Sequence, residues 1–226
     1  MSAEKATFLE SRAFDLLAAS PLIVWYGFAV AGIAFQQFPA ILHWHPSLGW
    51  NPLLRATTQL STALFLGVQV VLFLIRRLPL AKAAGFAPRF AGFVGANLVF
   101  AFLALPRAIL SDGVQAFSSA IVMLATLASI LVAVRLGRAF SVLPQARVFV
   151  YSGPYKYVRH PLYLAEQIGT WGLMLQFKQP WSILIAVASL AAQFPRMKYE
   201  EEILQETFPR YSHYAKNIYR LIPYIY

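Results

Sequence analysis

The chain has 226 residues, of which 59% are hydrophobic and only 12% are charged. A soluble globular domain is about 45–50% apolar and about 25% charged. These proportions argue against a soluble enzyme, a disordered chain or a coiled coil, and they favour an integral membrane protein. The sequence has no Cys, which excludes disulfides, a thiolate nucleophile and a Cys-based metal site. The formal net charge of +10 could serve a nucleic-acid partner or a membrane surface, so its distribution along the chain decides between them.

Six apolar stretches are predicted to be membrane-spanning helices, because a helix needs about 20 mainly apolar residues to cross a bilayer. They cover residues 21–42, 57–75, 90–105, 117–134, 161–177 and 181–194. The short link between the last two predicts a tight helical hairpin. Helical spacing continues through the charged residues up to 208, so we expect the sixth helix to leave the membrane without a break. The predicted fold is an all-α integral membrane protein with about six transmembrane helices and a cytoplasmic C-terminal segment.

The N-terminal residues do not resemble a signal peptide. Glu4, Glu10 and Asp15 do not fit the basic segment that begins such a peptide, and the first apolar stretch is too long for one. We expect residues 2–18 to form a short amphipathic segment on the membrane surface.

The basic residues predict the topology. Sixteen of the 19 Lys and Arg residues fall in the N-terminal segment, the loops after the second and fourth spans, and the C-terminal segment. The opposite side has Arg55, Arg107 and Lys178. Because cytoplasmic loops are enriched in Lys and Arg, both termini are predicted to be cytoplasmic. This distribution explains the net charge by topology and by attraction to anionic lipids, so we expect no nucleic-acid partner.

Most of the polar chemistry lies in the C-terminal part of the chain. Residues 135–226 contain 10 of the 11 Tyr, so we predict a catalytic region there and N-terminal transmembrane helices over residues 1–134. The patterns G-x-G-x-x-G, G-x-x-x-x-G-K-[ST], H-E-x-x-H and G-x-S-x-G are all absent, which excludes several nucleotide, zinc and hydrolase sites. His43 and His45 flank Trp44 with few carboxylates nearby. We interpret them as interfacial side chains and expect no metal site.

Residues 153–163 read G-P-Y-K-Y-V-R-H-P-L-Y. Gly-Pro indicates a turn, and Pro161 is a residue type favoured in the first turn of a helix. We therefore expect Tyr155, Arg159 and His160 at the cytoplasmic mouth of the fifth span. Free backbone N–H groups and the positive end of the helix dipole would suit an anionic ligand group there. The alternative is an interfacial belt of aromatic and basic side chains.

Residues 196–204 read R-M-K-Y-E-E-E-I-L. Arg196 and Glu200 are four residues apart, as are Lys198 and Glu202, so each pair shares a helix face. The hairpin would return this helix end to His160, so one site could hold residues from both runs. The alternative is a set of surface ion pairs that contribute only a few tenths of a kcal/mol each.

Glu166 lies inside the fifth predicted span. An ionisable residue within a membrane span is a functional candidate that usually faces the interior of the bundle. A neutral, hydrogen-bonded glutamic acid with a structural role is the alternative.

Together with F-P-R-Y-S-H-Y at residues 208–214, these two runs resemble the isoprenylcysteine carboxyl methyltransferase family, which groups with the membrane phospholipid N-methyltransferases. The resemblance covers about residues 135–223 and includes L-G-R-A-F-S upstream, whereas the first four spans show nothing diagnostic. It implies S-adenosylmethionine as methyl donor, bound in a cytoplasm-facing cavity between the hairpin and the C-terminal segment. A lipophilic acceptor would enter laterally from the bilayer.

The resemblance also implies site residues. Arg196 matches the substrate-side arginine of the carboxyl methyltransferases and could orient a carboxylate or phenolate. A neutral amine or phenol would need a base, for which Glu166 and Glu201 are candidates. Two departures are that the eukaryotic prenylcysteine enzymes have an apolar residue at the position of Glu166, and a longer stretch where this chain has 145–150. The implied cofactor contacts are Gln145, Arg147, Val148, Phe149, Val150, Tyr155, His160, Pro161, Leu162, Tyr163 and Glu200.

The side-chain chemistry is consistent with this donor. His160 suits the carboxylate of S-adenosylmethionine, and Glu200 suits its ammonium or a ribose hydroxyl. Tyr155 and Tyr163 can stack on adenine or face the sulfonium through cation–π attraction. Methyl transfer mainly needs alignment of two substrates and exclusion of water, so it requires no nucleophilic Ser or Cys.

We therefore predict an S-adenosylmethionine-dependent membrane methyltransferase. The acceptor could be a prenylcysteine-like carboxylate, a phospholipid amine, a phenolic lipid or a small thiol. A second interpretation is an intramembrane NADPH-dependent sterol-type reductase, in which Arg147 and Lys156 would bind the 2′-phosphate. A third is a small transporter, a class that usually shows internal repeats and paired ionisable residues at mid-membrane depth.

Overall fold

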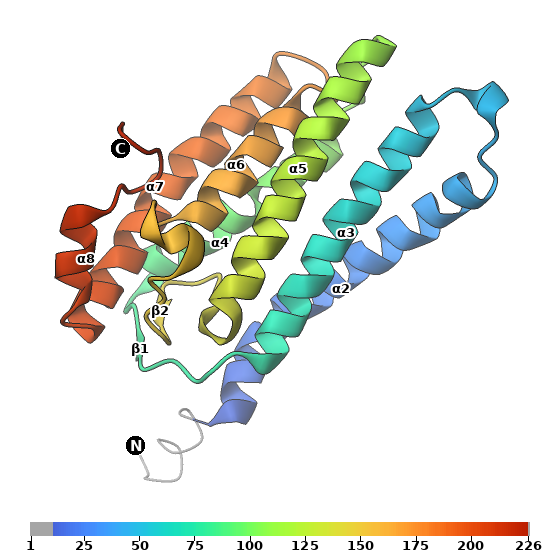
Figure 1. Ribbon diagram of the computed structural model, residues 1–226. Coiled ribbons are helices and arrows are strands. Elements are labelled where there is room, and N and C mark those ends of the chain that lie inside the picture. The colour runs from blue at the N-terminus through green and yellow to red at the C-terminus, as the bar shows by residue number, and fades with distance from the viewer. Residues whose placement is uncertain (1–10, 226) are drawn as a thin grey trace.

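The computed structural model describes residues 11–225, and they are mostly helical (Figure 1). The first helix, α2 (Arg12–Leu42), begins where the Ser11 side chain accepts a hydrogen bond from the Phe14 amide at 3.2 Å. Such a cap satisfies an amide that has no partner within the helix. Residues 12–18 are therefore the first turns of this long helix, and the prediction of a separate surface segment is wrong for them. Residues 2–10 of that prediction lie outside the described part of the chain.

Within residues 11–225, four helices are long and apolar enough to cross a membrane. They are α2, α3 (Asn51–Ile75), the continuous stretch of α4 (Phe86–Asn97) and the 3-10 helix η2 (Leu98–Ala104), and α5 (Asp112–Leu136) with the 3-10 helix η3 (Gly137–Ala139). They correspond to the first four predicted spans. A short 3-10 helix, η1 (Pro46–Leu48), lies in the link between α2 and α3.

The C-terminal helices form the predicted hairpin. Helix α6 (Pro161–Met174) has 14 residues, which is about 21 Å at 1.5 Å per residue and shorter than the roughly 30 Å hydrocarbon core. Helix α7 (Trp181–Thr207) is one uninterrupted helix that continues through the charged run. This confirms the expected continuity, whereas membrane crossing by α6 and α7 stays a prediction. Helix α8 (Tyr211–Asn217) and an extended segment follow.

The helices pack in the spatial order α2, α3, α5, α6, α7 and α4 (Figure 1). Small residues permit close approach at these contacts. A Cβ atom on Gly172 of α6 would lie 2.7 Å from Ile121 Cγ2 of α5. A Cβ atom on Gly95 of α4 would lie 2.9 Å from Arg196 Cδ of α7. These two glycines therefore determine how closely α6 and α7 pack against their neighbours.

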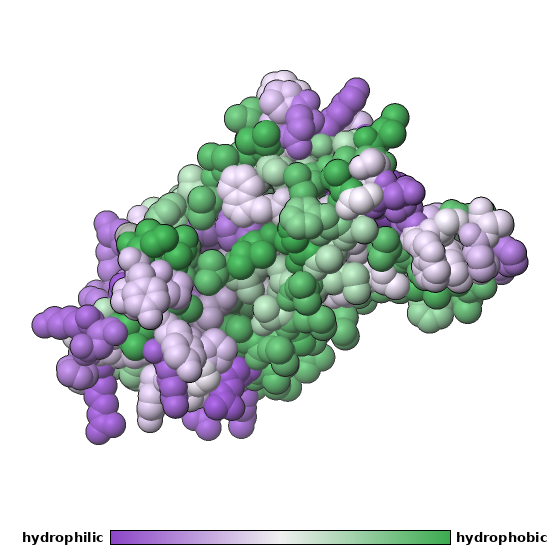
Figure 2. All heavy atoms as spheres, turned by 45° about the horizontal axis from the view of Figure 1, so that its top comes forward, coloured by the Kyte–Doolittle hydropathy of each residue, from purple (hydrophilic) through white to green (hydrophobic). Residues whose placement is uncertain are grey.

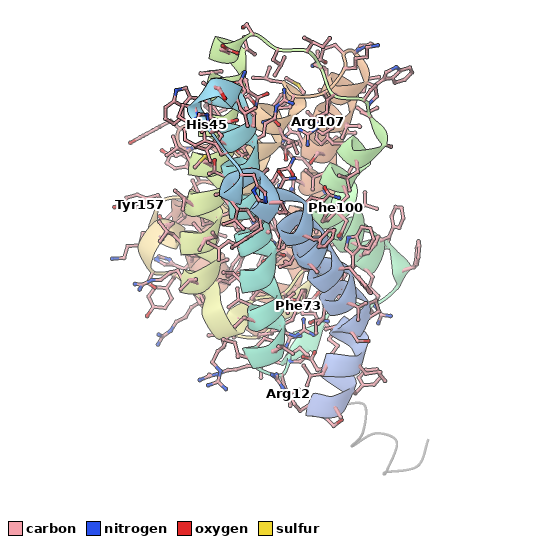
Figure 3. All side chains as sticks on the ribbon, turned by 90° about the vertical axis from the view of Figure 1, so that its right-hand side faces the viewer. Arg12, His45, Phe73, Phe100, Arg107 and Tyr157 are labelled. Atoms are coloured by element: carbon pink, nitrogen blue, oxygen red, sulfur yellow. The ribbon has the colours of Figure 1, made fainter. Side chains whose placement is uncertain are left out.

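Polar side chains gather toward the ends of the molecule, and hydrophobic ones cover much of its middle (Figure 2). Arg12 lies near one end and His45 and Arg107 near the other, with Phe73 and Phe100 between them (Figure 3). At the Arg12 end, strand β1 (Ala81–Lys82) pairs antiparallel with β2 (Gln145–Ala146). This pairing connects the loop after α3 to the loop after α5, which contributes to the candidate site.

Candidate active site

A cavity of about 50 Å³ lies where the loop after α5, the start of α6, the charged half of α7 and α8 meet. A 3-10 helix, η4 (Gly153–Lys156), brings Tyr155 to it. Its lining residues come from segments far apart in the sequence. They are Leu136, Ala139, Ser141, Leu143, Gln145, Arg147, Val148, Phe149, Val150, Tyr155, Arg159, His160, Glu200, Leu204, Tyr211 and Tyr214.

Eight of the eleven predicted cofactor contacts line this cavity. Residues 145–150, here called the cavity wall, contribute five of them. Pro161, Leu162 and Tyr163 are buried in the first turn of α6 and lie outside the lining. The cavity thus brings the two sequence runs together, and the assignment of these residues to a cofactor stays a prediction.

The lining also includes residues that the predicted contacts did not contain. Tyr211 and Tyr214 of α8 form one side, and the Tyr214 hydroxyl donates to the Tyr155 carbonyl at 2.7 Å. Burial raises the pKa of Tyr214 to about 12 and raises that of Tyr155 as well, so both phenols stay protonated near neutral pH. The F-P-R-Y-S-H-Y run that contains Tyr211 and Tyr214 was the available signal for this side of the cavity.

Glu201 lies at the centre of a buried ion-pair cluster behind the cavity. Its Oε1 contacts His160 Nε2 at 2.8 Å and Arg220 Nε at 3.0 Å, and its Oε2 accepts from Arg159 Nη1 at 3.0 Å. Burial alone would raise the pKa of Glu201, but the hydrogen bond with His160 and the nearby guanidinium groups outweigh it and lower the pKa. Both carboxylate oxygens are thus occupied, a geometry that favours a structural role over the predicted role as a base.

The start of α6 differs from the predicted open helix mouth. The Arg159 amide donates to the Tyr219 carbonyl at 2.8 Å, and the His160 amide donates to the Arg220 carbonyl at 3.1 Å. The C-terminal segment therefore occupies these two N–H groups, which are not free for a ligand. The same segment adds Arg220 to the Glu201 cluster, so it holds the first turn of α6 in place.

Glu200 is the carboxylate that lines the cavity, with 31% of its side chain exposed. It accepts a hydrogen bond from the Tyr163 hydroxyl. The Tyr163 ring stacks against the His160 ring, with centroids 5.1 Å apart and planes 9° apart. Tyr163 therefore positions Glu200 from outside the cavity lining. The Glu200 carboxylate can still accept a hydrogen bond from a cation or hydroxyl of a ligand.

Arg196 lies over the Tyr163 ring and outside the cavity lining. Its guanidinium carbon is 4.0 Å from the Tyr163 ring centroid, and its Nη1 is 3.7 Å from Glu166 Oε2. The ion pair forms with Glu166 on the facing helix, so the expected Arg196–Glu200 pair is wrong. The expected pair of Lys198 with Glu202 is present at 3.9 Å. Arg196 Nε is buried and has no hydrogen-bond partner.

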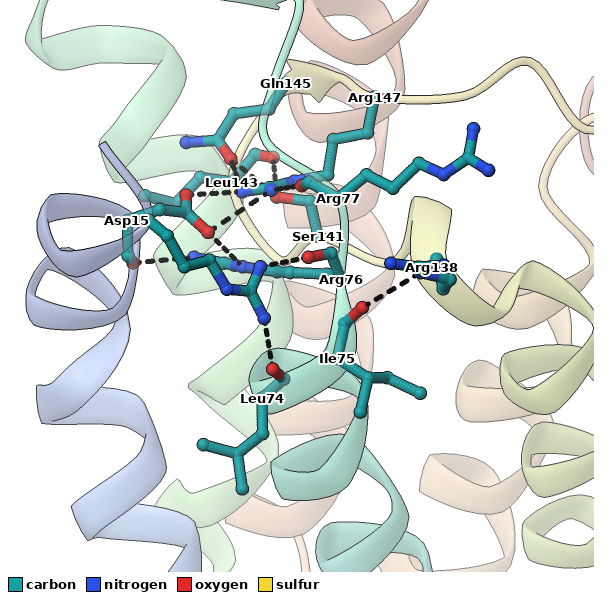
Figure 4. A network of polar contacts seen from close by, with 11 residues as sticks. Asp15, Leu74, Ile75, Arg76, Arg77, Arg138, Ser141, Leu143, Gln145 and Arg147 are labelled. Carbon is teal, nitrogen blue, oxygen red and sulfur yellow. Dashed lines mark hydrogen bonds and ion pairs between the residues drawn. The ribbon is translucent and has the colours of Figure 1, made fainter. Parts of the chain in front are cut away.

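The cavity wall is anchored from the N-terminal helix. Arg147 Nη2 donates to Asp15 Oδ1 at 2.8 Å and to Gln145 Oε1 at 2.6 Å. Arg76 Nε donates to Asp15 Oδ2 at 2.8 Å, so Asp15 lies between two guanidinium groups (Figure 4). The sequence predicted that Arg147 would contact a ligand, and its bond to Asp15 was not expected. Sequence analysis missed the role of Asp15 because its partners Arg76 and Arg147 are 61 and 132 residues away along the chain.

The chemistry of the lining fits S-adenosylmethionine. Glu200 could accept from its ammonium or a ribose hydroxyl, and Phe149, Tyr155 and Tyr211 offer aromatic surface for adenine and sulfonium. Sites for molecules of this size have volumes of about 300–1,000 Å³, whereas this cavity has about 50 Å³. The cavity in this structure is therefore smaller than the sites that hold molecules of this size.

The fold and the site together define a class of protein: a bundle of apolar helices with a polar, aromatic-lined cavity near one end. Residues 106–211 match the family model described as phospholipid methyltransferase. This part of the chain is therefore similar to the phospholipid methyltransferase family, which confirms the resemblance drawn from the sequence. The apolar helices indicate a membrane protein, and the family that residues 106–211 resemble is one of methyltransferases. No curated protein sequence matches the chain.

Proposed function

We propose that the protein transfers a methyl group from S-adenosylmethionine to a lipophilic acceptor at the cytoplasmic face of a membrane. The observation that carries this proposal is the convergence of Glu200, the cavity wall and the tyrosines of α8 on one cavity, whose lining falls in the family-matching region except for Tyr214. The donor supplies an electrophilic methyl carbon when it is bound. The residues of the chain then need to hold it, align the acceptor and exclude water.

The acceptor group would approach from the membrane side of the cavity, where Glu166 and Arg196 pair. Glu166 has 23% of its side chain exposed, whereas Arg196 has 3%. Glu166 is therefore the member of the pair that an incoming group meets first, and it could take a proton from a neutral amine or phenol. A carboxylate acceptor would instead have to displace Glu166 from Arg196. This geometry favours a neutral acceptor over a prenylcysteine-like carboxylate.

The proposal includes a topology with six crossings. Helices α6 and α7 would complete the membrane domain, since α6 packs on α5 and α7 packs on both α6 and α4. The distribution of basic residues supports a cytoplasmic location for both termini. The cavity would then open to the cytoplasm beside the end of α5, with the acceptor entering from the bilayer.

The test is binding of S-adenosylhomocysteine to the detergent-purified protein, measured by calorimetry for the wild type, Glu200→Gln and Glu202→Gln. Loss of a charged hydrogen bond is worth about 1.5–3 kcal/mol, so Glu200→Gln should bind about 10- to 150-fold more weakly. Glu202→Gln is the matched control, because Glu202 lies on the same helix but pairs with Lys198 outside the cavity. Binding of NADPH, or of neither ligand, would contradict the proposal and favour the reductase or transporter interpretation.

A further inference from the structure

A second, more open hollow lies at the same end of the molecule, at the C-terminus of α3. Its volume is about 690 Å³, and it is lined by Arg12, Ile75, Arg76, Arg77, Leu78 and Arg138. The four arginines, here called the arginine groove, come from the start of α2, the end of α3 and the turn after α5. None of them belongs to the active-site cavity.

Three of the four groove arginines, Arg12, Arg76 and Arg138, donate to backbone carbonyl groups. The last carbonyls of a helix have no partner within it, and at the end of α3 guanidinium groups satisfy them. Arg12 donates to the Leu74 and Arg76 carbonyls, and Arg138 Nε donates to the Ile75 carbonyl at 3.3 Å (Figure 4). Each guanidinium has five N–H donors, so these bonds fix its position and leave donors available.

A glycine allows the turn after α5 to contribute Arg138 to the groove. Gly137 follows α5 with φ 51°, a region that glycine adopts without strain. The turn brings Arg138 back toward α3, where the Arg77 amide donates to the Arg138 carbonyl at 2.9 Å. The groove is thus a built feature joined by main-chain bonds.

The charge of the groove is poorly balanced within residues 11–225. Asp15 is the carboxylate that pairs with a groove arginine there, and it is shared between Arg76 and Arg147. Arg77 is exposed, and its side chain extends away from the bonded network (Figure 4). Several cationic groups therefore surround a space large enough for a phosphate-bearing headgroup.

The rim of the groove is apolar. Leu74, Ile75 and Leu78 are 50%, 46% and 41% exposed, and they continue the apolar surface of α3. The groove lies where α2 begins and where α3 and α5 end, and each of these is long and apolar enough to cross a membrane. An acyl chain could therefore lie along the rim while its headgroup occupies the groove.

We propose that the arginine groove binds the phosphate of an anionic phospholipid. Guanidinium groups bind phosphate oxygens with paired, charge-assisted hydrogen bonds, and basic pockets between transmembrane helices suit anionic headgroups. The apolar rim favours a lipid over a soluble phosphate. This site is separate from the active-site cavity, and the proposal does not depend on the proposed methyl transfer.

The test is native mass spectrometry of the full chain, titrated with phosphatidylglycerol and, in parallel, with phosphatidylcholine. The test variants are Arg77→Gln, which leaves the bonded network intact, and Arg77→Gln combined with Arg138→Gln. The control is Arg89→Gln, because Arg89 is an exposed arginine of α4 outside the groove. Thermal unfolding without added lipid checks that every variant is folded.

We expect the wild type to bind phosphatidylglycerol in preference to phosphatidylcholine. Each basic residue near an anionic surface contributes about 1 kcal/mol, so the affinity for phosphatidylglycerol should fall about fivefold in Arg77→Gln and at least about tenfold in the double variant. The control should keep wild-type affinity. Equal losses in the control and test variants, or no loss in the double variant, would overturn the proposal. Displacement of the lipid by millimolar inorganic phosphate would also overturn it, because the site would then recognise free phosphate.

Discussion

Asp15→Asn should disrupt the connection between the N-terminal helix and the cavity wall. The substitution preserves shape but leaves the Arg76 and Arg147 guanidinium groups without their shared counter-charge. The Arg147 side chain is fully buried and that of Arg76 is 5% exposed, so neither charge can be solvated by water. Removing the charge of one partner in a buried ion pair lowers the free energy of unfolding by about 3–5 kcal/mol. For a chain of this size the loss corresponds to a fall in the unfolding temperature of about 6–20 °C.

The assay is thermal unfolding in detergent, followed by tryptophan fluorescence, together with calorimetric binding of S-adenosylhomocysteine. Because Arg147 also holds Gln145, the variant should bind this ligand more weakly at temperatures where it is still folded. Asp112→Asn is the control, since Asp112 is exposed at the opposite end of the molecule and bonds to Asn51. We expect that control to change stability by less than about 0.5 kcal/mol.

A double variant separates two effects of Asp15→Asn, namely the loss of the ion pair and the burial of a guanidinium group without a counter-charge. Combining Asp15→Asn with Arg147→Gln removes one of the two stranded guanidinium groups, so the double variant should be less destabilised than the sum of the single variants. Coupling energies between contacting residues are about 0.5–3 kcal/mol. The reasoning is refuted if Asp15→Asn unfolds within a degree or two of the wild type and binds the ligand normally, or if the two substitutions are simply additive.

Three further predictions test other parts of the molecule. Arg196→Lys should lower methyl transfer at least about tenfold, because an ammonium lacks the planar guanidinium that lies over the Tyr163 ring and pairs with Glu166. S-adenosylhomocysteine binding should hardly change, and a parallel loss of binding would assign Arg196 to the donor site. The pKa of Glu201 in the folded state lies below the ordinary glutamate value of about 4.5, so its contribution to stability is present above about pH 4.5 and is lost as the pH falls through the folded pKa. Unfolding measured between pH 3 and 6 should therefore show a flatter acid slope in Glu201→Gln, and an unchanged slope would contradict the cluster. Reporter fusions after residues 50, 112 and 179 should report the far side of the membrane, and a cytoplasmic signal at any of them would refute the six-crossing topology.

Composition and spacing by themselves determined the class of the molecule. Apolar stretches without charges must be buried in protein or in lipid, and their length predicted the four long apolar helices found within residues 11–225. Gly153 and Pro154 indicated the turn before α6, and the charged run after residue 194 continued the helical spacing of α7. These features depend on neighbouring residues, so they could be predicted from the sequence alone.

Tertiary structure decided the pairing of charges. Local spacing placed Glu200 beside Arg196, yet Arg196 pairs with Glu166 on the facing helix, and Glu201 collects partners from two other segments. The sequence placed Asp15 in a predicted surface segment. In the structure, α3 and the cavity wall bring the guanidinium groups of Arg76 and Arg147 to its carboxylate. A buried charge must find an opposite charge wherever packing provides one, and that partner can lie at any distance along the chain. Only the packed helices show which partner it is.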